Sequence, residues 1–167
     1  TGRYTMLGNP FACAVDWATM SKTDLENTYW GWDPNLSSTG GYVTVSTLGD
    51  VTLVSPYTGS TGLNQYIQSG QGFFVRTSGS SPELIIREQD KVSNFNGNAF
   101  RPSNGSDQLS LLAINLRYLN NGGDTVLADG VVAAYDASFT LHPGIEDAAK
   151  LETSAENIAI LHDSLAL

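Results

Sequence analysis

The sequence predicts an all-β protein: an antiparallel β-sandwich, jelly-roll-like or immunoglobulin-like, with one or two short helices. Three observations support this fold class. Many short apolar segments alternate with turns rich in Gly, Ser, Asn and Pro. An Asn-Gly-Gly-Asp hairpin signal occupies residues 121–124. With 167 residues, 41% of them hydrophobic, the chain suits one domain, residues 1–167, with a core of its own.

The expected strands follow one another with few interruptions. They cover residues 3–7, 28–33, 41–47, 51–54, 72–77, 83–88, 109–118, 125–135, 157–161 and 165–167. Residues 11–26 are the best helical candidate, although their broken apolar spacing favours a short helix or turns. Residues 146–151 are expected to form one helical turn. Residues 93–107 resemble a linker, and we expect a loop pinned by its two phenylalanines.

Residues 27–42 organise the first half of the chain. Strand alternation sends Trp30 and Trp32 to one face and Tyr29 to the other. Pro34 has no N–H for a sheet ladder, so the strand ends near it. The following Gly40-Gly41 pair permits a sharp turn into the next strand. The pattern predicts an aromatic hairpin that serves either as sandwich core or as a stacking surface for a ligand.

The second half resumes the strand pattern after residue 108. Residues 109–118 carry apolar side chains at positions of both parities, which is typical of a strand inside a sandwich. Residues 120–124 then form the expected turn into a strand over 125–135. The chain starts and stops inside strand-like segments, so we expect a fragment excised from a longer secreted protein.

Composition narrows the range of partners. The net charge of −9 repels phosphate backbones and anionic membranes, so we expect no nucleic-acid partner. No apolar run approaches about 18 residues, so we expect no membrane insertion. The single cysteine, Cys13, cannot form an internal disulfide, and its apolar neighbours suggest a buried residue. We expect a monomer.

Catalytic constellations are weak in this sequence. No Gly-x-Ser-x-Gly elbow accompanies the two histidines, His142 and His162. Acidic residues are plentiful enough for chance pairing, and Glu88 lies beside basic residues, as on a solvated face. We therefore expect no enzyme activity. A glycan-active hydrolase or lyase is the weaker alternative.

Carboxylates in the second half suggest a structural calcium ion, with no other cofactor. Asp124, Asp129 and Asp136 offer hard oxygen ligands in or near loops. Their spacing does not match the EF-hand loop. The alternative is turn chemistry, in which Asp and Asn side chains bond their own backbone.

Aromatic residues suggest stacking on a neutral polysaccharide. Sugar rings present C–H faces that pack well on indole or phenol rings. The candidate ligand-binding residues are Trp30, Tyr57, Tyr66, Trp32 and Tyr29. A large aromatic on a strand is more often core, which is the reading favoured for Trp32 and Phe74. The polar surroundings of Tyr57 and Tyr66 make them better exposed candidates, and Trp30 stays undecided.

Several motifs together resemble a recurring module of extracellular proteins of Bacteroidota. They are Gly8-Asn9-Pro10-Phe11, Val15-Asp16-Trp17, Tyr29-Trp30-Gly31-Trp32-Asp33-Pro34, Gly40-Gly41-Tyr42, Ser69 to Val75, Asp129-Gly130 to Asp136, and Glu146 to Leu151. Such modules precede the C-terminal sorting domain of large proteins exported by the type IX secretion system. The resemblance implies a secreted or cell-surface location, neighbouring domains as partners and a β-sandwich, but no catalytic residues.

The resemblance also implies that most motif residues are turn and core determinants, which weakens Trp32 as a ligand platform. The leading expectation is a non-catalytic carbohydrate-binding module that binds polysaccharide by aromatic stacking. The alternative is a structural or adhesive spacer domain without a ligand of its own. Two or more exposed, nearly coplanar aromatic rings would favour the binding module, and burial of every tryptophan would favour the spacer.

Overall fold

The computed structural model describes residues 2–48, 51–56, 63–92, 110–140, 142–144, 147–151, 156–162 and 165–167. These residues form antiparallel strands and one short 3₁₀ helix, η1 (Glu88–Asp90). The strands are β1 (Tyr4–Gly8), β2 (Val15–Asp16), β3 (Ser21–Thr23), β4 (Leu25–Asp33), β5 (Gly41–Leu48), β6 (Val51–Ser55), β7 (Tyr66–Ile67), β8 (Gly72–Thr77), β9 (Glu83–Ile85), β10 (Ser110–Leu119), β11 (Thr125–Tyr135), β12 (Leu161–His162) and β13 (Leu165–Ala166).

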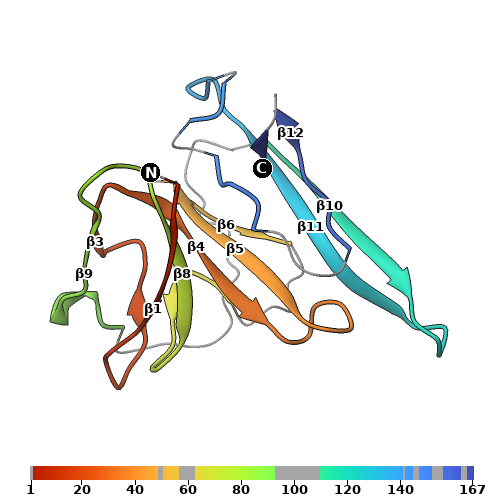
Figure 1. Ribbon diagram of the computed structural model, residues 1–167, viewed down its shortest axis with the longest axis horizontal. Coiled ribbons are helices and arrows are strands. Elements are labelled where there is room, and N and C mark those ends of the chain that lie inside the picture. Colours follow the sequence, from red (N-terminus) through yellow and green to blue (C-terminus); the bar gives the residue numbers. More distant parts are fainter. Residues whose placement is uncertain are drawn as a thin grey trace.

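A five-stranded sheet in the order β1-β8-β4-β5-β6 is the centre of the fold (Figure 1). Its core-facing side carries Tyr29, Val45 and Val75, which lie opposite one another in adjacent strands. Two short ribbons, β2–β7 and β3–β9, accompany this sheet. Trp17, just after β2, packs edge-on against the rings of Tyr29 and Phe73 at centroid distances of 5.5 and 6.0 Å. These contacts bury the main hydrophobic core.

Asn9 ties the end of β1 to the β2–β7 ribbon. Its side-chain amide donates to the carbonyl groups of Cys13, Ile67 and Gln68 at 2.8, 3.0 and 3.1 Å. Its Oδ1 accepts the N–H of Phe11 at 2.9 Å. Because Asn9 is buried, these bonds satisfy backbone groups that water cannot reach.

The β10–β11 hairpin extends to one side of the sheet (Figure 1). Its inner strand β11 lies against β6, where Ser55 Oγ donates to the Gly130 carbonyl at 2.8 Å. Asp129 of β11 is buried and forms an ion pair with Lys150, with 2.5 Å between Oδ1 and Nζ. Its Oδ2 accepts the N–H of Ile158 at 2.9 Å. Asp129 thus fastens two C-terminal segments to the hairpin.

The structure confirms an antiparallel, mostly β chain and corrects its expected helices. The described residues contain no α-helix, and none of their helices could cross a membrane. Residues 11–26 form turns and the short strands β2 and β3. Residues 147–151 are irregular, while residue 146 and the expected loop at 93–107 lie outside the described residues. The expected strand over 83–88 ends at Ile85, and η1 begins at Glu88.

Candidate functional site

The side of the sheet opposite the main core is rich in aromatic residues. Antiparallel register places Met6, Phe74 and Trp30 opposite one another across β1, β8 and β4. Trp32 and Tyr42 are paired in the same way across β4 and β5. We name the side chains of this surface the aromatic face. They are Tyr4, Met6, Trp30, Trp32, Tyr42 and Phe74.

Ring contacts order the aromatic face. Tyr4 meets Trp30 edge-on at 5.1 Å, Trp32 meets Tyr42 at 4.9 Å, and Tyr42 meets Phe74 at 5.8 Å, all with interplanar angles above 75°. Edge-to-face contacts of this kind are favourable arrangements of aromatic quadrupoles. They hold the rings in fixed orientations, which lowers the entropy that a ligand would otherwise have to remove.

Trp32 is the exposed member among the tryptophans, with 46% of its surface accessible. A Cβ on Gly40 would overlap the indole of Trp32, so the ring can occupy this position only because Gly40 has no side chain. Gly40 also has φ +84°, a conformation that glycine adopts readily. The Gly40-Gly41 pair of the sequence therefore positions Trp32 as well as turning the chain.

Hydrogen bonds among its own polar groups hold the loop that follows Trp32. Asp33 Oδ1 accepts the backbone N–H of Asn35 at 2.9 Å and its side-chain amide at 3.1 Å. Further along, the Ser37 N–H donates to the Leu127 carbonyl of β11 at 2.7 Å. Asn35 itself is exposed three residues after Trp32, and its side-chain amide is directed to Asp33.

The structure divides the aromatic candidates between buried and exposed positions. Trp30 and Tyr29 have no exposed surface, so the prediction that they stack on a ligand is wrong. Phe74 and Tyr4 flank Trp30, while Tyr29 lies in the main core, where its hydroxyl donates to the Asn64 carbonyl. The prediction that Trp32 is core is also wrong. Burial raises the pKa of Tyr29 well above that of free tyrosine.

The remaining candidates contribute less to this surface. Tyr66 is half-buried on β7, opposite Asp16, and does not belong to the aromatic face. Tyr57 lies outside the described residues. Sequence reasoning missed Tyr4 and Met6 as members of the aromatic face. The signal that could have found them is the cross-strand register, which a single sequence does not supply directly.

The predicted calcium site is not formed. Asp124 and Asp136 lie beyond opposite ends of β11, roughly 35–40 Å apart at the rise of an extended strand. Asp129 lies between them and already forms an ion pair with Lys150 and a hydrogen bond with Ile158. Among the described residues, no group of three or more His, Cys, Asp or Glu side chains could hold a metal ion.

The alternative of turn chemistry describes these residues well. Asn120 Oδ1 accepts the N–H groups of Gly122 and Asp124, both at 2.9 Å. Asp136 Oδ1 accepts the hydroxyl and the N–H of Ser138 at 2.6 and 2.8 Å. These two hydrogen bonds from Ser138 lower the pKa of Asp136. Asp136 therefore caps an Asx-type turn after β11, and Asp124 lies in the turn before β11 that Asn120 caps.

One ion pair borders the aromatic face. Arg76 of β8 pairs with Glu26 of β4, and its guanidinium lies 5.8 Å from the ring centroid of Tyr4. Burial raises the pKa of Glu26, and the hydrogen bond and charge of Arg76 lower it in part. Arg76 thus balances the charge of Glu26 at the border of the aromatic face.

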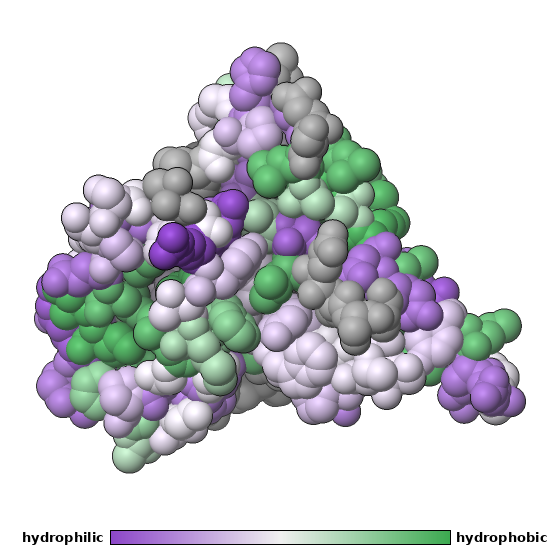
Figure 2. All heavy atoms as spheres, viewed as in Figure 1, coloured by the Kyte–Doolittle hydropathy of each residue, from purple (hydrophilic) through white to green (hydrophobic). Residues whose placement is uncertain are grey.

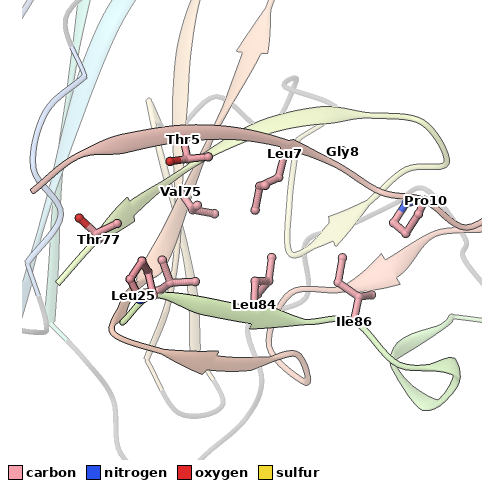
Figure 3. Close-up of a pocket in the computed structure, with 10 residues that line it drawn as sticks. Thr5, Leu7, Gly8, Pro10, Leu25, Val75, Thr77, Leu84 and Ile86 are labelled. Carbon is pink, nitrogen blue, oxygen red and sulfur yellow. The ribbon is translucent and has the colours of Figure 1, made fainter. Parts of the chain in front are cut away.

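An aliphatic slot of about 460 Å³ opens on the core-facing side of the sheet, between its edge strand β1 and the β9 segment. Figure 3 shows Leu7, Leu84 and Ile86 pointing into it from the two sides. Thr5 and Thr77 carry the polar side chains among its lining residues. Such a lining suits aliphatic groups and offers a sugar few hydrogen-bond partners.

A second cavity of about 430 Å³ lies between the β5–β6 face and β11. It includes ionisable side chains, among them Asp136, Lys150 and His162. The rings of His142 and His162 meet edge-on at 5.8 Å. Lys150 is already paired with Asp129, and Asp136 caps its own turn, so these groups have structural tasks.

Comparisons with protein-family models, curated proteins and solved structures gave no match to this chain.

Proposed function

We propose that this chain is a non-catalytic carbohydrate-binding module of a secreted or cell-surface protein, with Trp32 as its stacking platform. The observation that carries the proposal is the half-exposed indole of Trp32, held by Gly40 and by the ring of Tyr42. An exposed apolar ring gains free energy when a ligand removes its surface from water. Sugar C–H faces are suitable partners for such a ring.

The surroundings of Trp32 support a neutral ligand. Charged residues make up 15% of the chain, below the roughly 25% of ordinary soluble domains. The hydroxyl of Tyr42, whose ring touches that of Trp32, can exchange hydrogen bonds with sugar hydroxyls. The net charge of −9 disfavours polyanions such as nucleic acids.

The wider setting belongs to the same proposal. The motif resemblance supports a module of a type IX-exported protein of Bacteroidota, with neighbouring domains in the same chain. It also supports a β-sandwich as the finer description of the antiparallel fold. The motif residues Asn9, Gly40 and Asp129 have the turn and packing tasks that such a resemblance implies.

A spacer domain without a ligand is the second candidate, and one observation favours it. Trp17 and Trp30 are fully buried, and the ring of Trp32 makes an angle of 77° with that of Tyr42. The described part of the aromatic face therefore has no coplanar pair of exposed rings. A single indole platform predicts weak binding per module, whereas a spacer predicts none.

Affinity electrophoresis against soluble plant and algal polysaccharides distinguishes the two candidates. The wild-type chain, Trp32→Ala and Tyr135→Ala are run on the same gels. Tyr135 is 57% exposed and lies at the end of β11, outside the aromatic face, so it is the matched control. We expect one glycan to retard the wild type and Tyr135→Ala but not Trp32→Ala. Equal retardation of Trp32→Ala, or none with any glycan, would contradict the proposal.

A further inference from the structure

The aliphatic slot beside β1 is a cavity that polysaccharide binding does not use. Its volume of about 460 Å³ is typical of a ligand pocket, and voids of this size are uncommon in close-packed interiors. Leu7 of β1 faces Leu84 and Ile86 of the opposite wall (Figure 3). These three side chains are only partly buried, although they pack against the main core. A ligand that covers them therefore removes apolar surface from water.

The slot also reaches the molecular surface. Figure 2 shows hydrophobic residues gathered on the left side of the view, where Figure 1 places β3 and β9. Leu84 and Ile86, from β9 and just after it, belong to the lining of the slot. A ligand can thus enter from solvent without a change in the fold.

Hydrogen bonds fix the first end of the wall that residues 82–86 form. The N–H of Ser81 donates to Asp24 Oδ2 at 2.8 Å. The N–H groups of Ser78 and Gly79 donate to the backbone carbonyl of Asp24 at 2.9 and 3.3 Å. Moving this end of the wall toward β1 would break these bonds.

The second end of the wall is fixed in the same way. Arg87 follows the wall directly, and its N–H donates to Oδ2 of the buried Asp90 at 2.6 Å. A few residues later, the N–H of Val92 donates to the Ala14 carbonyl at 2.9 Å. Because both ends are held by hydrogen bonds, the wall does not collapse onto β1, and the slot is formed before any ligand arrives.

We propose that the aliphatic slot binds the alkyl chain of a neutral amphiphile, such as a fatty alcohol. The lining residues that the structure describes carry no aromatic ring and no ionisable group, so burial of apolar surface is the main source of affinity. From Pro82 to Ile86 the wall extends roughly 13 Å at the rise of a strand. An extended chain advances about 1.2 Å per bond, as a backbone does, so about ten carbons span the wall.

One end of the slot sets the orientation and charge of the ligand. Thr5 and Thr77 lie at the end marked by Leu25 (Figure 3). Thr77 Oγ1 accepts the N–H of Arg3 at 3.0 Å, which leaves its own O–H to donate to a ligand oxygen. Asp24 precedes Leu25, so a carboxylate head group here would meet a like charge in a chain of net charge −9. A neutral head group avoids this repulsion. The inference does not depend on polysaccharide binding.

Methyl NMR of the whole chain during titration with 1-octanol tests the slot. We expect saturable shifts at Leu7, Leu84 and Ile86, with a Kd of roughly 0.1–1 mM. Leu112 of β10 is 50% exposed and serves as the matched surface methyl, which should not saturate. Shifts at the slot methyls that stay linear, as at Leu112, would overturn the proposal.

A matched probe tests the charge of the ligand. Octanoate has the same chain length, and at pH 8 it should bind at least about fivefold more weakly than 1-octanol because of its carboxylate. Octanoate that binds as tightly as 1-octanol would overturn the assignment of a neutral amphiphile.

A filled slot provides the matching variant. Thr5 is exposed on an edge strand and lines the slot, so Thr5→Phe should place a ring in it without disturbing the core. We expect this variant to lose the saturable shifts and to keep its near-ultraviolet circular dichroism. Thr125→Phe is the control, because Thr125 is an equally exposed strand residue on β11, and it should titrate like the wild type. Unchanged binding in Thr5→Phe would overturn the slot as the site.

Discussion

The five-stranded sheet and the β10–β11 hairpin differ in how far they bury their apolar residues. All members of the buried core cluster lie between Val15 and Val75, in and around the five-stranded sheet. The β10–β11 hairpin contributes buried residues through β11 alone, and β10 leaves Leu111, Leu112 and Leu119 exposed. The first part is therefore stabilised mainly by packing. The second part depends on a few polar contacts.

Those polar contacts connect segments that lie far apart in the sequence. Asp129 joins Lys150 and Ile158, Ser55 bonds to Gly130, and Ser37 bonds to Leu127. Each contact fixes the hairpin or the C-terminal segment at one point. A region held in this way should open locally more readily than the core, which gives the comparison a set of direct tests.

The largest effect is expected for Asp129→Ala. This change leaves the ammonium of Lys150 buried without its partner, and breaking a buried pair in this way costs about 3–5 kcal/mol. Hydrogen exchange should show that backbone amides of β11 and of residues 156–162 lose protection, while those of the core strands keep it.

Glu88→Ala is the matched control, because the Glu88–Lys91 pair lies at the surface. Its effect should stay within about 0.5 kcal/mol. Uniform loss of protection across β4, β5 and β8 in Asp129→Ala would contradict the separation of the two parts.

A pair of leucine truncations compares the two parts directly. Leu36→Ala removes a buried member of the core cluster and should lower the free energy of unfolding by about 2–5 kcal/mol. Leu119→Ala removes a side chain that is already in water and should change it by less than about 0.5 kcal/mol. Chemical denaturation measures both, and similar losses would show that β10 is packed in solution.

Gly40→Ala should displace the Trp32 ring and lower the free energy of unfolding by about 1–3 kcal/mol. The change adds both a strained positive φ and a clash with the indole. Gly70→Ala is the matched control, because Gly70 has φ +68° but no atom within 4 Å of its Cβ position.

Tryptophan emission and polysaccharide retardation should therefore change in Gly40→Ala alone. Equal changes in the Gly70→Ala variant would mean that backbone strain, and not the seat of the ring, is responsible.

The smallest effect concerns pH and the Glu26–Arg76 pair. Burial raises the pKa of Glu26 above its usual value near 4.5, so the folded state favours the protonated acid. The contribution of Glu26 to stability is thus full below pH 4.5 and declines as pH rises through the raised pKa. In urea denaturation from pH 3 to 8, Glu26→Gln should gain stability relative to wild type as pH rises. A constant or falling difference would contradict this sign.

Local patterns predicted much of the fold. The strands β8 and β11 match the expected spans of 72–77 and 125–135, and the turn at 120–124 forms as predicted. Alternation and turn residues specify these elements within a few positions. By contrast, β2, β3 and β7 were missed, because two or three residues carry no periodicity. Their partners also lie far along the chain, as Val15 and Ile67 do.

The candidate site was only partly predictable for a related reason. Alternation correctly puts Trp30 and Trp32 on one face, but burial depends on the neighbouring strands. Trp30 lies opposite Phe74 of β8, and its ring meets that of Tyr4. The pairing of β4 with β8 ends at Trp30, so among the described strands Trp32 has only β5 beside it. Neighbours on both sides cover one indole, and a neighbour on one side leaves the other partly exposed. No single strand of sequence contains that difference.

Iodide quenching of tryptophan fluorescence, with and without polysaccharide, tests the role of Trp32 most directly. Trp17 and Trp30 are fully buried, so iodide should quench one component of the emission, which Trp32→Phe removes. The glycan that retards the chain should protect this component in proportion to its binding. A quenchable component that persists in Trp32→Phe, or that no polysaccharide protects, would contradict the assignment of Trp32 as the stacking platform.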